Sequence, residues 1–185
     1  MAQRRRESFT ERRERRAAVD DPAVVLEAAT RFLEARSRSV AEVRRRLRNA
    51  GYRTELIDGA IARLGDLGVL DDEAFARAWV ESRDRARPRG ERALQNELRL
   101  KGVDRTIVDR VLEERGSDGD TAGPSPDRAA AERLIEKHAR ALERIADPRR
   151  RRERAYALLA RNGFDPETCR EVAARVTAQV SEQDR

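Results

Sequence analysis

The chain contains few of the residues on which enzymes and metal centres depend. Its 185 residues include one cysteine, one histidine and one tryptophan, and aromatic residues make up only 4%. A lone cysteine, Cys169, excludes an internal disulfide and a zinc site built from cysteines. His138 has apolar neighbours at helical spacing, which favours a histidine at the edge of a core over a catalytic base. The composition therefore provides no catalytic group of the usual kinds.

Sequence motifs for nucleotide and metal binding are equally scarce. No GxxxxGK[ST] loop is present to hold phosphates, so an ATPase is not expected. The three acids at 71–73 favour capping of a helix start over a metal site. No apolar run could span a membrane, and the arginines near the N-terminus are not followed by the apolar core of a secretory signal. We expect a cytoplasmic protein that is not an enzyme, with no cofactor, no metal and no membrane partner.

Charge is abundant, and its positive part is almost entirely arginine. Charged residues make up 41% of the chain, the net charge is +6, and the only lysines are Lys101 and Lys137. Guanidinium groups bind phosphates and carboxylates in a bidentate manner, so nucleic acid and acidic protein surfaces are both plausible partners. Residues 1–16 hold seven arginines against three glutamates. Residues 1–20 lack apolar periodicity, which predicts a disordered basic tail.

One pattern occurs three times along the chain. Each copy has a leucine, a glycine four residues later, an apolar residue directly after the glycine, and apolar residues at helical spacing on both sides. Glycine at such a place is typical of a helix end in the left-handed conformation, where the next apolar residue packs back on the helix. The leucine, glycine and following residue are Leu47, Gly51 and Tyr52, then Leu98, Gly102 and Val103, then Leu159, Gly163 and Phe164.

The spacing of these glycines leaves room for a third helix in each repeat. The sequence therefore predicts an all-α fold of three tandem three-helix repeats. It predicts a leading helix over 21–39, a first repeat over 40–86, a second over 87–146 with a loop at 116–126, and a truncated third over 147–185. Phe75 and Trp79 share a stripe and are expected in the core of the first repeat. Cys169 occupies a column of buried apolar residues, as a small hydrophobe would.

Three arginine clusters are the candidate binding surface. Each opens or precedes the first helix of a predicted repeat, so stacked repeats would join them into an intermittent basic strip. Such a strip suits phosphate contact without base reading, and it equally suits an acidic protein groove. The candidate partner-binding residues are Arg44, Arg45, Arg48, Arg83, Arg87, Arg89, Arg149 and Arg150.

Over residues 23–180 the chain resembles the RecX family of RecA regulators. The most specific stretch is LDDEAFARAWVESR at 70–83, which comes after RSRSVAEVRRRLRNAG at 36–51. RGERALQNELRLKGV at 89–103 resembles the second repeat of the family, and RAYALLARNGF at 154–164 resembles the third. The resemblance implies a regulator that binds the RecA filament on single-stranded DNA and restrains its ATPase and recombinase activities. It implies no role for the N-terminal tail or for the 116–126 loop.

Two other functions remain open on the residues alone. A helix-turn-helix regulator would bind duplex DNA, but no helix carries an evident set of base-reading side chains. A passive helical scaffold would bind neither RecA nor DNA. We expect a monomer with RecA as its partner, and direct binding to single- or double-stranded DNA stays open as a second candidate.

Overall fold

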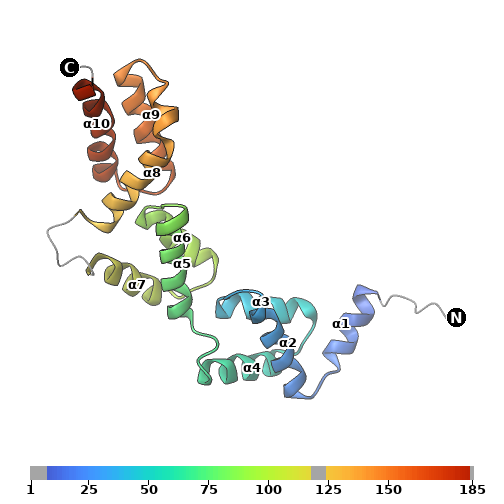
Figure 1. Cartoon of the computed structure of the whole chain (residues 1–185). Helices are drawn as coiled ribbons and strands as arrows, with labels where there is room; N and C mark the ends of the chain where they lie inside the picture. Colours follow the sequence, from blue (N-terminus) through green and yellow to red (C-terminus); the bar gives the residue numbers. More distant parts are fainter. Residues whose placement is uncertain (1–7, 118–123, 184–185) are drawn as a thin grey trace. The chain divides into compact units, whose positions relative to one another are not determined.

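The computed structural model describes residues 8–117 and 124–183, and all its regular elements are helices (Figure 1). This confirms the all-α fold, since the described residues contain no strand. No helix in these two ranges is long and apolar enough to cross a membrane. The ten helices are α1 (Phe9–Ala17), α2 (Pro22–Glu34), α3 (Val40–Ala50), α4 (Thr54–Asp66), α5 (Asp72–Ala86), α6 (Glu91–Leu100), α7 (Arg105–Ser117), α8 (Pro126–Glu143), α9 (Pro148–Arg161) and α10 (Pro166–Gln183).

The chain divides into two compact units. Unit 1 is Met1–Phe75 together with Lys101–Asp104, and unit 2 is Ala76–Leu100 together with Arg105–Arg185. The short segment after α6 therefore belongs to unit 1, although the helices on both sides of it belong to unit 2. Each unit is described below by itself.

The core of unit 1 is formed by α2, α3 and α4. Val25 and Ala29 of α2, Val43 and Leu47 of α3, and Ile57 of α4 are almost completely buried. Local signals account for the helix starts: the Asp21 carboxylate accepts a hydrogen bond from the backbone of Ala23, and Ser39 forms a capping box with Glu42. Apolar residues at helical spacing then bring the three helices together.

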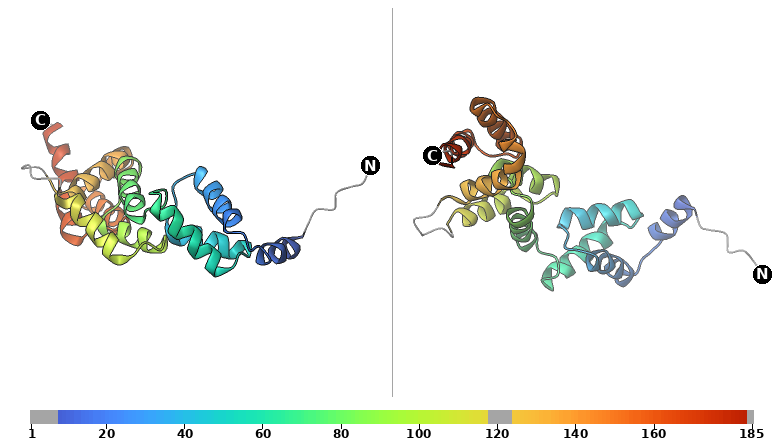
Figure 2. Two further views of the ribbon diagram at one scale, coloured as in Figure 1. Left: turned by 90° about the horizontal axis from the view of Figure 1, so that it is seen from below. Right: turned by 45° about the horizontal axis from the view of Figure 1, so that its top comes forward.

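In unit 2 the best-defined core belongs to α8, α9 and α10, which lie side by side in both views of Figure 2. Ala130 and Ala131 of α8 face Leu159 of α9 and Cys169 of α10, and all four are fully buried. Small alanines on α8 allow close helix contact, and the leucine fills the space between the helices.

These two cores divide the helices differently from the sequence prediction. The predicted repeats begin at 40, 87 and 147, whereas the cores group α2 with α3 and α4, and α8 with α9 and α10. In these two cores the third helix precedes the helix that ends at the repeat glycine. The repeated glycines Gly51, Gly102 and Gly163 mark the turn inside each repeat. They do not show whether the third helix of the repeat precedes or follows that turn.

The predicted disorder of the basic tail is wrong for residues 9–17, which form α1. Ser8 and Glu11 form a capping box that starts this helix, a local signal that the high charge of the segment masked. Residues 1–7 of the tail lie outside the described part of the chain. The 116–126 loop is shorter than predicted, because α7 continues to Ser117 and α8 begins at Pro126; residues 118–123 are not described.

All three repeat glycines adopt the left-handed conformation that their position predicts. Their φ angles are +102° at Gly51, +79° at Gly102 and +84° at Gly163. Asp165 caps the helix after the third glycine by accepting hydrogen bonds from Glu167 and Thr168. In the first repeat Thr54 is the first helical residue, and Arg53 precedes it without a side-chain cap.

Candidate partner-binding surface

In unit 1 the candidate arginines lie on the solvent side of α3. Val43 and Leu47 face the core, while Arg45 and Arg48 are exposed and make no ion pair in the described part of the chain. Arg44 is half-buried, and its guanidinium group contacts Asp58 of α4. Arg45 and Arg48 are therefore available to a partner, whereas Arg44 already has one.

In unit 2 two of the predicted arginines are engaged within the protein. Arg83 Nε donates to the Glu97 carboxylate at 2.6 Å, and Arg89 Nε lies 3.5 Å from the other oxygen of the same carboxylate. Arg89 also contacts the Asn162 side chain. Arg87, between them in sequence, is exposed. The break between α5 and α6 therefore holds one free arginine, Arg87, and one engaged arginine, Arg89, while Arg83 links α5 to α6.

Trp79 does not have the fully buried position that its stripe with Phe75 suggested. Phe75 is only 5% exposed, but Trp79 is half-buried. Its indole N–H donates to Glu97 at 2.8 Å, and the Arg83 guanidinium lies 4.3 Å from its ring centroid. Trp79 packs at the edge of a polar cluster because the helix carrying Glu97, α6, lies alongside it. Its stripe in α5 could not reveal that neighbour.

The first turns of α9 carry the most exposed candidates. The side chains of Arg149 and Arg150 are 88% and 81% exposed, and they pair only with Glu153 and Asp147 of their own segment. Arg151 behaves differently: it is buried, and its guanidinium group donates two hydrogen bonds to the Ile145 carbonyl, at 2.8 and 3.0 Å. One arginine run thus contains a structural residue beside two solvated ones.

In unit 1 the start of α3 holds the segment that contains Gly102. Ser39 Oγ donates to the carbonyl of Lys101 at 2.6 Å, and Lys101 Nζ lies 2.9 Å from the buried Glu42 carboxylate. Burial opposes ionisation of Glu42, but hydrogen bonds from Lys101 and Ser39 outweigh it and lower the pKa of the carboxyl. One repeat is thereby tied to the start of another.

A corresponding contact occurs in unit 2, at the start of α6. The Gly90 amide donates to the carbonyl of Asn162 at 3.0 Å, and Asn162 precedes Gly163 as Lys101 precedes Gly102. Gly90 and Ser39 each stand twelve residues before the glycine of their own copy. The repeats therefore contact one another at equivalent sequence positions, through a side-chain hydroxyl at Ser39 and a backbone amide at Gly90.

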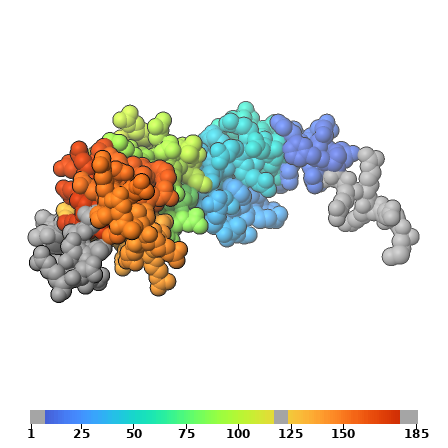
Figure 3. All heavy atoms as spheres, turned by 90° about the horizontal axis from the view of Figure 1, so that it is seen from above, coloured from blue at the N-terminus to red at the C-terminus, as the bar shows by residue number. Residues whose placement is uncertain are grey.

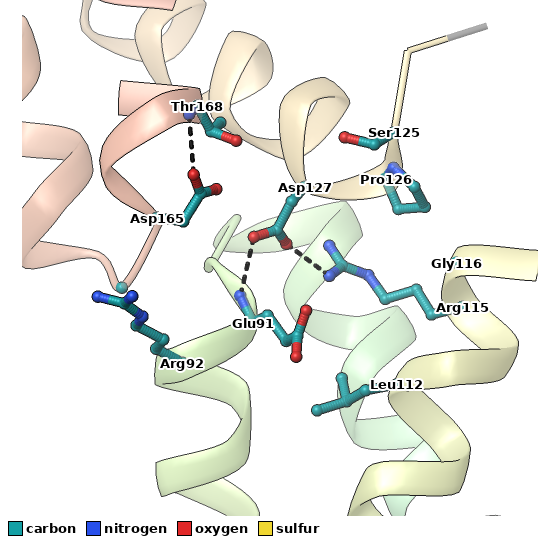
Figure 4. A pocket seen from close by; sticks show the side chains of 11 residues that line it. Glu91, Arg92, Leu112, Arg115, Gly116, Ser125, Pro126, Asp127, Asp165 and Thr168 are labelled. Atoms are coloured by element: carbon teal, nitrogen blue, oxygen red, sulfur yellow. Dashed lines mark hydrogen bonds and ion pairs between the residues drawn. The ribbon is translucent and has the colours of Figure 1, made fainter. Parts of the chain in front are cut away.

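A cavity of about 370 Å³ lies in unit 2 where the starts of α6, α8 and α10 converge (Figure 4). Asp127 accepts from the Glu91 amide at 3.1 Å and from Arg115 at 2.8 Å. Arg115 also pairs with Asp84. Burial disfavours the charged guanidinium, but the carboxylates of Asp84 and Asp127 outweigh burial and raise the pKa of Arg115 above its usual value. Carboxylates already neutralise the helix N-termini here, so the cavity is a structural junction rather than an anion site.

The two residues weighed as catalytic candidates have structural surroundings. Cys169 is fully buried, and burial raises the pKa of its thiol, which leaves it unreactive. His138 is exposed rather than at a core edge, and its Nδ1 lies 2.9 Å from the Leu134 carbonyl. Within the described residues no three His, Cys, Asp or Glu side chains are grouped to hold a metal ion.

Sequence reasoning did not identify the residues that join the helices. The partners of these residues lie on other elements, so their roles could not be predicted from neighbouring positions. The residues are Glu97, Lys101, Arg115 and Arg151. Only the pair Ser39 and Glu42 had a visible signal, a serine followed three residues later by a glutamate.

The chain matches three-helix domains of known proteins. Residues 26–64 match the first three-helix domain of RecX, and residues 71–112 match the second. The chain is 35% identical over 150 residues to "Regulatory protein RecX" of Mycobacterium leprae, covering 80% of this chain and 84% of the relative. It is 32% identical to the protein of the same name from Chlorobium phaeobacteroides, covering 84% and 95%.

Solved structures support the same fold. A crystal structure of RecX from Lactobacillus salivarius superposes with a TM-score of 0.72 at 21% identity, covering 86% of this chain and 98% of that one. The first matched domain begins within α2, in agreement with the core that α2 shares with α3 and α4. The second begins just before α5. Fold, domain matches and sequence identity together place the chain in the RecX family of regulatory proteins.

Proposed function

We propose that this protein binds the RecA filament on single-stranded DNA and restrains its ATPase and recombinase activities. Membership of a regulatory family supports a regulatory role, and the name RecX implies RecA as partner. The described residues contribute surface contacts rather than a grouped set of reactive side chains. Regulation then follows from occupancy of a surface on the filament.

The observation that carries the proposal is the set of arginines that the fold leaves exposed. Arg45 and Arg48 in unit 1 and Arg87 in unit 2 make no ion pair in the described residues, and Arg149 and Arg150 pair only locally. Exposed pairs of this kind contribute little to stability, so these arginines are free to contact acidic side chains or phosphates. Contacts from several repeats to successive filament subunits would add through avidity.

The test replaces Arg45, Arg48, Arg87, Arg149 and Arg150 together by glutamate. Arg44, Arg83 and Arg89 stay unchanged because they hold contacts inside the fold. The matched control replaces five other exposed arginines by glutamate: Arg31, Arg63, Arg85, Arg105 and Arg170. Both sets change the net charge from +6 to −4, so the comparison separates the location of the charges from their total.

Binding to RecA on single-stranded DNA and RecA ATPase activity are measured for both variants at several salt concentrations. The first variant should bind at least about tenfold more weakly, since five contacts are reversed together, and the control should retain more binding. RecA without DNA, and DNA without RecA, separate carboxylate from phosphate contacts. If the folded first variant suppressed the ATPase at the wild-type concentration, these arginines would not form the working surface.

A further inference from the structure

The glycine ends of the second and third copies dock against the start of an earlier helix. A Cβ added to Gly102 would lie 2.3 Å from the Cβ of Ala41, at the start of α3. A Cβ added to Gly163 would lie 2.5 Å from the Cβ and backbone nitrogen of Ala93, at the start of α6. Such distances leave no room for a side chain, so each glycine serves both its own turn and the contact between copies.

The first copy has no earlier repeat, yet its glycine is covered in the same way. A Cβ added to Gly51 would lie 2.6 Å from Cγ and 2.8 Å from the backbone oxygen of Arg13, in α1. The space-filling view shows the atoms of α1 against those of α3 at this end of unit 1 (Figure 3). Helix α1 therefore takes the place that α3 and α6 take at the other two glycines.

The residue after each glycine is covered in a parallel way, and in the first copy α1 contributes to that cover. Val103 and Phe164 are 5% and 3% exposed. Tyr52 is only partly buried, and the Arg16 guanidinium of α1 lies 5.7 Å from its ring centroid. An ion pair at 2.5 Å between Arg53 and Asp20 fastens the chain just after α1 to the same turn.

The capping box of helix α1 marks where it starts but is not enough to keep so short a helix ordered. It has nine residues, none of them buried, and isolated helices shorter than about 12–15 residues are marginal in water. Its contact with the Gly51 turn is therefore what keeps it helical. Exchange of its amide hydrogens reports directly on that contact.

The third copy lacks a corresponding docking surface at the start of its glycine-ended helix, α9. Ala41 and Ala93 stand ten and nine residues before the glycines of their own copies, and the equivalent positions in α9 are Glu153 and Arg154. These are large, exposed and charged, and α9 begins four residues earlier than α3 and α6 do relative to their glycines. Another glycine end could not approach the start of α9 as closely.

We propose that the Gly51–Tyr52 end of α3 is a helix-docking surface, and that α1 is its resident ligand and closes the repeat array. Terminal elements that differ from the internal repeats are a general need of repeat proteins, because an uncovered end exposes surface meant for a neighbour. The occupant is a segment of this chain, so the inference does not depend on the RecA partner proposed above.

The experiment compares Gly51→Ala with Gly68→Ala in the full chain by hydrogen exchange. Both glycines have positive φ, +102° and +65°, so both substitutions strain the backbone. A Cβ at Gly68 meets nothing within 4 Å, whereas one at Gly51 meets the backbone of α1. The amides of 9–17 should exchange as unstructured chain in Gly51→Ala and as in wild type in Gly68→Ala.

A milder variant covers the case in which Gly51→Ala does not fold. Arg16→Ala removes only the contact with the Tyr52 ring, and it should speed exchange in α1 by about two- to fivefold, as expected for an exposed cation–π pair. The amides of α3 and α4 should be unaffected. Unchanged exchange in α1 in both Gly51→Ala and Arg16→Ala, or an equal loss of protection in Gly68→Ala, would overturn the proposal.

Discussion

Lys101 Nζ and the Glu42 carboxylate lie 2.9 Å apart, although 59 positions separate them in the sequence. Arg36 faces the same carboxylate at 3.7 Å, and Ser39 donates its backbone amide to it. This buried carboxylate therefore joins the start of α3 to the segment after α6. It is also where the stability of unit 1 should respond to pH.

Replacement of Glu42 by Gln should lower the free energy of unfolding at pH 7 by about 1.5–3 kcal/mol, because charge-assisted hydrogen bonds are lost. The folded-state pKa of Glu42 is lowered from 4.5. Its contribution is therefore present above that value and is lost as pH falls through the folded pKa. Urea unfolding between pH 7 and pH 3 should show a flatter pH dependence in the variant, and parallel curves would contradict this assignment.

Asp72→Asn serves as a control, because folding shifts the pKa of Asp72 in the direction opposite to that of Glu42. Burial raises the pKa of Asp72, and the nearby Asp71 and Glu42 add to the effect, although the Val40 amide donates to its carboxylate. The charged form is thus disfavoured by folding, a cost that is present above the folded pKa and relieved as pH falls. Asparagine keeps the acceptor for Val40, so the variant should be at least as stable as wild type at pH 7.

Gly102→Val should destabilise the protein by about 1 kcal/mol or more, since a β-branched residue resists positive φ. The Cβ would also meet Ala41, as described above. Gly59→Ala is the control, because Gly59 is helical and a Cβ there meets nothing within 4 Å. That change should stabilise by about 0.5–1 kcal/mol. Equal melting temperatures for Gly102→Val and wild type would show that this contact is not needed.

Trp79 and Glu97 should be energetically coupled. Trp79→Phe keeps an aromatic ring, smaller than the indole, and removes the N–H donor; it should cost about 1.5–3 kcal/mol because the carboxylate loses a hydrogen bond. A double-mutant cycle with Glu97→Ala, which removes the acceptor, read by urea unfolding, should give a coupling free energy of about 0.5–3 kcal/mol. Additive effects would indicate that the hydrogen bond contributes nothing to folding.

Local signals predicted most of the helices. Asp21 with Pro22 marked the start of α2, and the three glycines marked the turns that follow α3, α6 and α9. Each such signal acts within one turn of the backbone, so it can be read from neighbouring residues alone. The capping box at Ser8 and Glu11 is of the same kind, but the charge of the surrounding segment outweighed it in the prediction.

The candidate surface was predicted less well, because exposure depends on partners from other helices. Arg45 and Arg83 look alike in sequence, yet Arg45 is free and Arg83 is held by Glu97. The same holds for Arg150 and Arg151, one solvated and one buried.

By itself the sequence determined the helical class, the glycine turns and the family, because these follow from short-range periodicity, backbone conformation and motif. The tertiary structure alone decided where repeats begin, which arginines are free and why α1 is ordered. The physical reason is that burial, ion pairing and the docking of a helix too short to be stable alone arise only when distant segments meet.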